Sequence, residues 1–215
     1  DMVYTAPTTG IAAVTLTAKS GELSAIARAR VLPPLPWKFD FSDGQIPPVW
    51  IGANYRHKPA PLDGAKGLVK ISTIPLGTRS QSWMGQPTLH DYTVQADFKA
   101  TDTNGRLPDL GLINLQGAQR LQVRSWVARL ELRFAKTIDM NWSSGKWYTM
   151  KFQCENKDGK AILRGKVWER DQAEPKEWQI EAADAAPNTH GSPGLFGNAT
   201  DSEFFIDNVQ VTADK

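Results

Sequence analysis

The stretch "WYTMKFQCENKDGKAILRGKVW", residues 147–168, contains the clearest β-hairpin of the chain. Apolar side chains occupy alternate positions of its first half: Tyr148, Met150, Phe152 and Cys154. This period of two is typical of a strand with one buried face. Asp158 and Gly159 lie between the two halves, and an Asp-Gly pair favours a tight turn that needs positive φ. The same pattern predicts that Cys154 is a small buried hydrophobe rather than a reactive thiol.

Many other stretches alternate in the same way, and turn-forming residues separate them, whereas helical periodicity is almost absent. The segments expected to form strands are 11–18, 22–32, 37–42, 67–73, 79–84, 92–100, 110–116, 120–126, 129–135, 147–155, 161–169, 177–182, 194–198 and 203–212. Their inward faces include Tyr92, Val94, Ala96 and Phe98, then Leu121 and Val123, then Leu130, Leu132 and Phe134. Short strands with one buried and one solvent-exposed face predict an all-β fold in which two antiparallel sheets pack as a sandwich.

The composition changes near residue 33. Residues 1–32 are rich in Ala and Thr and contain no Trp, although the whole chain has 8. Three prolines within residues 33–36 disfavour a central strand and stiffen the chain. The sequence therefore predicts a strand fragment over 1–32, a Pro-rich linker over 33–36 and the main domain over 37–215. The fragment has too few strands to stand alone, so we expect it to pack on the main domain or to complete a domain that begins upstream.

Charge and cysteine content exclude several classes of function. The net charge of +2 over 215 residues provides no strong field for nucleic acid, and the basic residues are scattered among acidic ones. No run of 18 apolar residues predicts membrane insertion. A single Cys permits no intrachain disulfide, and no zinc-type Cys/His spacing occurs. We therefore expect no cofactor, apart from a possible structural calcium.

Four segments carry a resemblance to a known fold: "WKFDFSDG" (37–44), "HDYTVQADFKA" (90–100), "KWYTMKFQCENKDGKAILRGKVWER" (146–170) and "GSPGLFGNATDSEFFIDNVQVT" (191–212). Together they resemble a concanavalin A-like jelly roll of the laminin-G/glucanase type. Within that group they are most similar to 3-keto-disaccharide hydrolase-like domains of secreted bacterial proteins. The resemblance implies a two-sheet antiparallel jelly-roll sandwich whose short opening strand pairs beside the final strand.

The first residues carry a second resemblance. "YTAPTTGIAAVTLTA" (4–18) is similar to the closing strands of a bacterial immunoglobulin-like domain. With the Pro-rich linker and the jelly roll, it resembles the C-terminal part of bacterial PQQ-repeat β-propeller (quinoprotein-like) proteins. This implies an exported protein, periplasmic, cell-surface or extracellular, whose upstream domains are its partners. No propeller blade is present, so quinone binding is carried over to no residue.

Catalytic patterns are absent from the sequence. A retaining glycosidase needs two carboxyl groups roughly 5–5.5 Å apart, which jelly-roll enzymes supply at alternate positions of one strand. No such set occurs, and Glu131 stands between Arg129 and Arg133, an arrangement that suits an ion pair better than a proton donor. Asp97 and Asp109 are the remaining weak candidates. No Ser-His-Asp pattern is present either, so no catalytic residue is assigned.

A row of polar and aromatic residues on alternate positions is the strongest signal for binding. One strand carries Arg79, Gln81 and Trp83, and others carry Gln122, Arg124 and Trp126, or Glu131 and Arg133. If these strands neighbour one another, the row forms a patch that suits sugars, because an indole stacks on C–H-rich ring faces while Arg and Gln donate hydrogen bonds to hydroxyl groups. The simpler explanation is structural: arginine stems cover apolar surface, Arg–Glu pairs link strands, and the tryptophans cap the edge of the core.

Two further sets of residues are weaker candidates. His57 is expected in a surface loop, where it either faces solvent or contacts a ligand. Asp40 and Asp43 of the opening strand and Asp207 of the last strand provide hard oxygen ligands where the ends of the domain meet. They predict a calcium site, and capping of turns explains the same residues.

Three functions remain open. The first is a non-catalytic carbohydrate-binding or adhesion module of a larger exported bacterial protein. The second is a glycoside hydrolase-like enzyme that acts on glycosides or 3-keto-glycosides. The third is a purely structural domain that packs against an upstream β-propeller, in which case the polar row is an interdomain surface.

Overall fold

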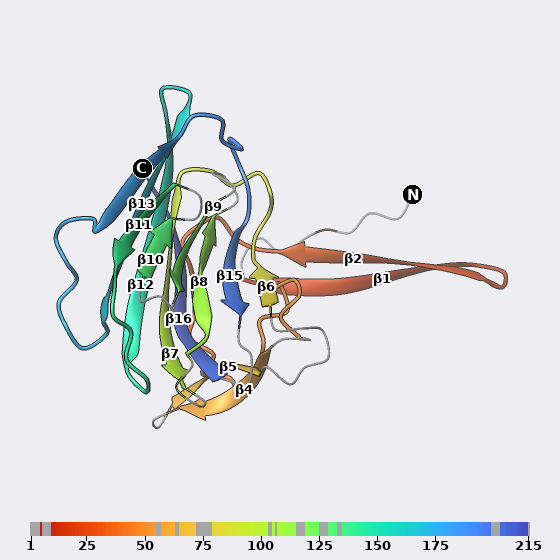
Figure 1. Cartoon of the computed structure of the whole chain (residues 1–215). Helices are drawn as coiled ribbons and strands as arrows, with labels where there is room; N and C mark the ends of the chain where they lie inside the picture. Colours follow the sequence, from red (N-terminus) through yellow and green to blue (C-terminus); the bar gives the residue numbers. More distant parts are fainter. Residues whose placement is uncertain are drawn as a thin grey trace.

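The structure is a computed structural model that describes residues 5, 10–54, 57–62, 65–71, 79–102, 105, 107–114, 119–124, 129–132, 135–198 and 203–214. Two of its sheets form a sandwich (Figure 1). The six-stranded sheet has the order β11 (Lys136–Asp139), β10 (Arg129–Leu132), β9 (Gln119–Arg124), β8 (Asp109–Asn114), β15 (Pro193–Asn198) and β6 (Arg79–Trp83). The described part of the chain contains no α-helix, and the antiparallel sheets confirm the predicted all-β sandwich.

The second layer is an eight-stranded sheet. Its order is β14 (Ile180–Asp184), β13 (Lys160–Glu169), β12 (Trp147–Lys157), β7 (Tyr92–Thr101), β16 (Glu203–Ala213), β5 (Ala65–Ile71) and β4 (His57–Leu62), and β3 (Trp37–Phe39) also pairs with β16. The pairing of β3 with β16 places the opening strand beside the final strand, as the resemblance implied. Among the described residues, no helix is long and apolar enough to cross a membrane.

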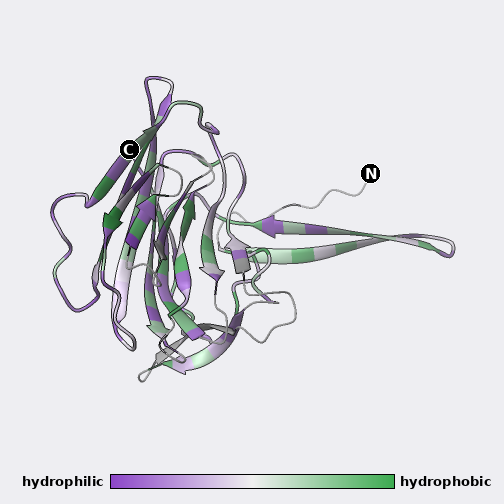
Figure 2. Ribbon diagram, viewed as in Figure 1, coloured by the Kyte–Doolittle hydropathy of each residue, from purple (hydrophilic) through white to green (hydrophobic). Residues whose placement is uncertain are grey.

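The core lies between the two sheets and is built by the alternation seen in the sequence. Phe98, Phe152 and Cys154 have no exposed surface, and Leu121 of β9 is buried opposite them. A Cβ built on Gly165 of β13 would lie 2.6 Å from Leu121 Cδ1, which shows how closely the layers approach. Figure 2 shows the resulting alternation of hydrophobic and hydrophilic residues along the strands.

The hairpin predicted around Asp158 and Gly159 forms as expected. Strands β12 and β13 pair through to Lys157 and Lys160, and Asp158 and Gly159 connect them. Both connecting residues have positive φ, 51° and 75°. An Asp-Gly pair tolerates these angles better than most other residues, so the turn fixes the register of these two long strands.

Residues 57–62 correct one expectation. We expected His57 in a surface loop, but it begins strand β4, which pairs with β5 at the edge of the eight-stranded sheet. Pro59 and Pro61 lie in this strand. An edge strand tolerates proline because one row of its N–H groups needs no partner in the sheet.

The Pro-rich segment that leads into β3, residues 32–36, is attached to the core of the sandwich. Leu32 and Leu35 are partly buried against the core cluster, and the indole Nε1 of Trp37 donates a hydrogen bond to the carbonyl oxygen of Pro33 over 2.7 Å. The Pro-rich residues therefore hold a fixed path along the sandwich instead of forming a loose spacer.

The third sheet is a two-stranded ribbon of β1 (Ala12–Ser20) and β2 (Leu23–Val31), which pair only with each other among the described strands. Figure 1 shows the ribbon projecting away from the sandwich. Of the two arrangements expected for the N-terminal fragment, packing along the main domain is not observed.

Candidate functional site

Backbone register aligns the outward side chains of the six-stranded sheet into two rows that cross its strands. The first row consists of Gln81, Phe196, Gly111, Gln122, Glu131 and Thr137. The second consists of Ile51, Trp83, Gly194, Ile113 and Arg120. The residues that alternate with them, such as Ser82, Leu121 and Leu130, are fully buried between the sheets. Both rows therefore lie on the outer face of the six-stranded sheet.

Trp83 is half-buried and lies against the backbone of the neighbouring strand. A Cβ built on Gly194 of β15 would lie 2.7 Å from Cε3 of the indole, so the ring occupies space that a larger residue would fill. On its other side, the Ile51 N–H donates to the Trp83 carbonyl over 2.8 Å, and the Trp83 N–H donates to the Ile51 carbonyl over 3.0 Å. The indole is thus positioned by backbone on both sides, at the edge of the outer face.

Polar side chains with defined contacts continue the outer face beyond Trp83. The guanidinium of Arg120 lies over the ring of Phe196, 4.2 Å from its centroid, and Phe196 is only 6% exposed. Gln122 Nε2 donates a hydrogen bond to Glu131 Oε2 over 3.3 Å. These contacts orient a planar cation and an amide–carboxylate pair on the outer face.

The structure brings the predicted row together in one sheet, although two strands intervene. Gln81 and Trp83 lie on β6, whereas Gln122 lies on β9, with β15 and β8 between them. Three strand spacings of about 4.8 Å separate β6 from β9 by roughly 14 Å. The predicted residues therefore form two ends of one face rather than a compact cluster.

Two other predicted residues are placed only by their backbone. Arg79 begins β6 and Arg124 ends β9, but their side chains are outside the described part of the structure. Trp126 and Arg133 also lie outside the described residues. Binding by any residue of the row stays a prediction.

Sequence reasoning did not assign Phe196 and Arg120 to the site. Arg120 alternates with Gln122 on one strand, so the pattern that selected Gln122 also indicated Arg120. Phe196 stands between Leu195 and Gly197 in a nearly continuous apolar stretch, where alternation gives no signal. Only the pairing of β15 with β8 and β6 shows that Phe196 points outward.

His57 does not contribute to a ligand-binding loop. Its side chain is 3% exposed, and its Nδ1 lies 3.4 Å from the hydroxyl of Ser82, which belongs to the opposite sheet. The imidazole therefore lies between the layers at the edge of the core, where a soluble ligand does not reach it.

The three weak catalytic candidates are divided between the two sheets. Asp97 lies on β7 of the eight-stranded sheet, is 5% exposed, and accepts hydrogen bonds from Thr149 Oγ1 at 2.7 Å and Asn208 Nδ2 at 2.9 Å. Its carboxylate is thus held within that sheet. Glu131 and Asp109 share the six-stranded sheet, where they lie two strands and two residues apart.

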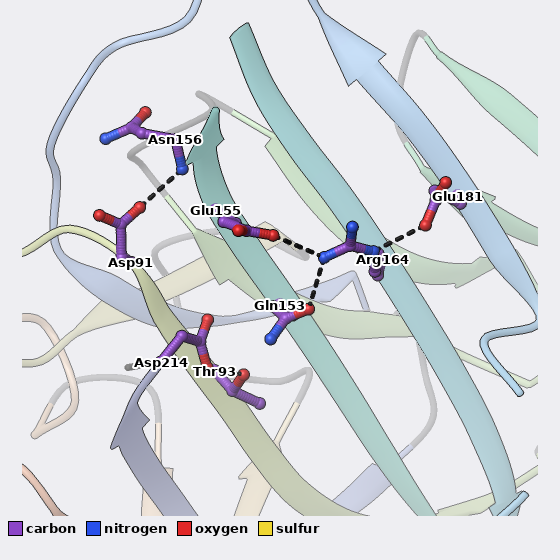
Figure 3. A network of polar contacts seen from close by, with 8 residues as sticks. All are labelled: Asp91, Thr93, Gln153, Glu155, Asn156, Arg164, Glu181 and Asp214. Carbon is purple, nitrogen blue, oxygen red and sulfur yellow. Dashed lines mark hydrogen bonds and ion pairs between the residues drawn. The ribbon is translucent and has the colours of Figure 1, made fainter. Parts of the chain in front are cut away.

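The outer face of the eight-stranded sheet is occupied by contacts within the chain (Figure 3). Arg164 Nε donates to Glu181 over 2.7 Å, and its Nη1 donates to Glu155 over 2.8 Å and to Gln153 over 3.0 Å. The hydrogen bond with Glu155 is the main cause that raises the pKa of Arg164. This guanidinium links three strands, which favours a structural role for that face.

The predicted calcium ligands are arranged mainly as turn caps. Asp40 and Asp43 each accept the backbone N–H of the residue two positions ahead, over 3.1 and 2.8 Å. Asp207 pairs across the strands with Asp97. Among the described residues, no group of three or more His, Cys, Asp or Glu is placed to hold a metal ion. These residues do not fit calcium as a set, and the calcium ion stays a prediction.

Comparisons with known proteins define the class of fold. The structure matches peanut lectin (10% identity, 83% of this chain and 96% of the lectin, TM-score 0.53). It also matches lectin UEA-II complexed with galactose (8%, 83% and 98%, TM-score 0.52). A third match is a Bacillus subtilis protein of unknown function with a galectin-like fold (11%, 73% and 86%, TM-score 0.51).

At these identities the matches show the fold alone: the main domain is a lectin-like, two-sheet antiparallel jelly-roll sandwich. No protein-family model matches the sequence. No curated protein matches it either.

Proposed function

We propose that the chain is a non-catalytic carbohydrate-binding module and that its ligand lies across the outer face of the six-stranded sheet. The observation that carries the proposal is the row of Trp83 and Arg120: the indole lies on β6, and the guanidinium of Arg120 lies over Phe196 of β15, the strand next to β6. An indole stacks on the C–H face of a pyranose, and arginine and glutamine donate hydrogen bonds to hydroxyl groups.

The geometry favours a ligand with several sugar units. Between Trp83 and Arg120, the central strands contribute Gly194 and Ile113, and Ile113 is 4% exposed. Polar and aromatic groups run from Gln81 and Trp83 on β6, past the Arg120 guanidinium over Phe196, to Glu131 on β10, four strand spacings or roughly 19 Å from β6. A single sugar contacts only part of this row, whereas an oligosaccharide spans it.

The fold supports the proposal without specifying the ligand. Lectin UEA-II, one of the matched structures, is complexed with galactose, and the present proposal places a ligand of the same chemical class on this chain. We include in the proposal the wider context that the sequence resemblances imply: an exported bacterial protein, related to 3-keto-disaccharide hydrolase-like domains, in which the module follows a PQQ-repeat propeller.

The enzymatic alternative receives less support from the geometry. Glu131 is bonded to Gln122, and Asp97 lies on the other sheet, so the carboxylates named from the sequence do not flank a common bond. If the domain is purely structural, the polar row is an interdomain surface. The isolated chain should then bind no glycan.

A polysaccharide pull-down followed by titration calorimetry tests the proposal. We expect retention on at least one glycan and about tenfold weaker binding for Trp83→Ala, a loss of ~1.4 kcal/mol. Trp168→Ala is the matched control, because Trp168 is a half-buried tryptophan on the outer face of the other sheet. Absence of retention on every glycan tested, or equal loss in both variants, would contradict the proposal. Turnover of a glycoside abolished by Glu131→Gln would establish the enzyme instead.

A further inference from the structure

The two-stranded ribbon separates its residues sharply by face. Direct cross-strand pairs put one set on a single face: Ala12, Val14, Leu16, Ala18 and Ser20 of β1, with Leu23, Ala25, Ala27, Ala29 and Val31 of β2. All of them except Ser20 are apolar. The opposite face carries Thr15, Thr17, Lys19, Ser24, Arg28 and Arg30, together with only two apolar residues, Ala13 and Ile26. Figure 2 shows hydrophobic and hydrophilic residues alternating along both strands. The ribbon is therefore built to bury one side.

The far part of this apolar face is uncovered. Leu23 is 77% exposed and Leu16 is 42% exposed, whereas Val14 and Val31, nearer the sandwich, are partly buried. An isolated two-stranded hairpin is at best marginally stable in water, and it needs a further layer or further strands. The ribbon cannot fold back easily, because Leu32, Leu35 and the Trp37–Pro33 hydrogen bond fix the direction in which it leaves the sandwich.

The size of the face discriminates between possible occupants. Nine residues per strand give a length of about 30 Å, and two strands give a width of about 10 Å, so the face covers roughly 300 Å². A stable interface between separate molecules buries about 800 Å² on each partner. Two copies joined only through their ribbons would fall well short of that area. A layer in the same polypeptide needs no such area, because tethering gives it an effective concentration in the mM range.

We propose that the apolar face of the ribbon is covered by a second antiparallel β-layer of the same polypeptide. The ribbon is then half of a small neighbouring β-sandwich, and residues 32–36 form a rigid junction between two domains. The surface that docks is the face with Val14, Leu16 and Leu23, and the face with Lys19, Arg28 and Arg30 remains in solvent.

Amide hydrogen exchange of β1 and β2 tests whether the apolar face of the ribbon is covered. In the 215-residue chain, we expect the amides of β1 and β2 to exchange at least 100-fold faster than those of β12 and β13. In a polypeptide extended to include the residues encoded before Asp1, the β1 and β2 amides should become protected by a similar factor. A gene that encodes no β-rich segment there, or an extended chain without added protection, would overturn the proposal.

A matched pair of variants identifies the docking face. In the extended polypeptide, Leu16→Asp should remove the added protection, and Thr15→Asp, on the opposite face of the same strand, should leave it intact. Protection of β12 and β13 should not change in either variant, which confirms that the jelly roll remains folded. Equal effects of the two variants would contradict the assignment of the face. Protection that rises with the concentration of the 215-residue chain, with dimers in sedimentation, would show that the occupant is a second copy.

Discussion

Asp207 illustrates an electrostatic cost at the level of a single residue. It lies directly across from Asp97 in the β16–β7 pairing, and Asp97 is held in place by Thr149 and Asn208. Burial raises the pKa of Asp207, and the Asp97 carboxylate adds to the rise. A raised pKa means that the folded state favours the protonated acid, so this contribution to stability is present below the usual pKa and is lost as the pH rises through the folded value.

We therefore predict that Asp207→Asn raises the thermal midpoint at pH 7. The gain should shrink as the pH falls and vanish below the unmodified carboxyl pKa of 3.8, where both proteins carry a neutral side chain. The Asn208 N–H, which donates to Asp207 Oδ1 over 2.8 Å, keeps an acceptor in the variant. Thermal unfolding with a chelator present, from pH 3 to pH 8, measures the effect. A variant less stable at pH 7 would contradict the prediction and show that the charged form of Asp207 stabilises the fold.

Single residues also show what alternation predicts. Tyr92, Phe98, Phe152 and Cys154 are buried as expected, because period two assigns the faces of a strand directly. Alternation does not reveal to which sheet a strand belongs. Asp97 was therefore grouped with Glu131 in the sequence, and only the long-range pairing separates them.

At the scale of elements, local sequence patterns predict the β12–β13 hairpin, but they do not predict β4 and β11, the strands at the edges of the two sheets. The Asp158–Gly159 turn was predictable because few residues adopt positive φ. Strand β4 was missed because Pro59 and Pro61 disfavour a strand unless it lies at an edge, and edge position is a property of the whole sheet. Strand β11 was missed because it has only four residues, of which Lys136, Thr137 and Asp139 are polar.

The β12–β13 turn carries a prediction of its own. Gly159→Ala places a Cβ at φ 75° and should destabilise the protein by about 1–2 kcal/mol. This corresponds to a fall of about 2–8 °C in thermal midpoint for a chain of this size. Asp158→Asn is the control, because Asn tolerates positive φ and should leave the midpoint nearly unchanged. Equal losses in the two variants would indicate that side-chain contacts, rather than backbone conformation, determine the turn.

At the scale of the whole molecule, the two outer faces differ in what they offer a ligand. On the eight-stranded sheet, Arg164 is engaged by Glu155 and Glu181 within the chain. On the six-stranded sheet, the half-buried Trp83 lies against Gly194, and the Arg120 guanidinium lies over the ring of Phe196. The sequence predicted Trp83 and Gln122 from alternation, but the roughly 14 Å between their strands follows from the insertion of β15 and β8, which no local pattern reveals.

Chemical-shift mapping by NMR with an oligosaccharide retained in the pull-down tests the central claim most directly. We predict that the perturbed backbone amides lie on β6, β15, β8, β9 and β10, with the largest shifts near Trp83, Gln81 and Arg120. Amides of β7, β12 and β13 should shift little. Perturbations concentrated on the eight-stranded sheet, or on the ribbon, would contradict the account.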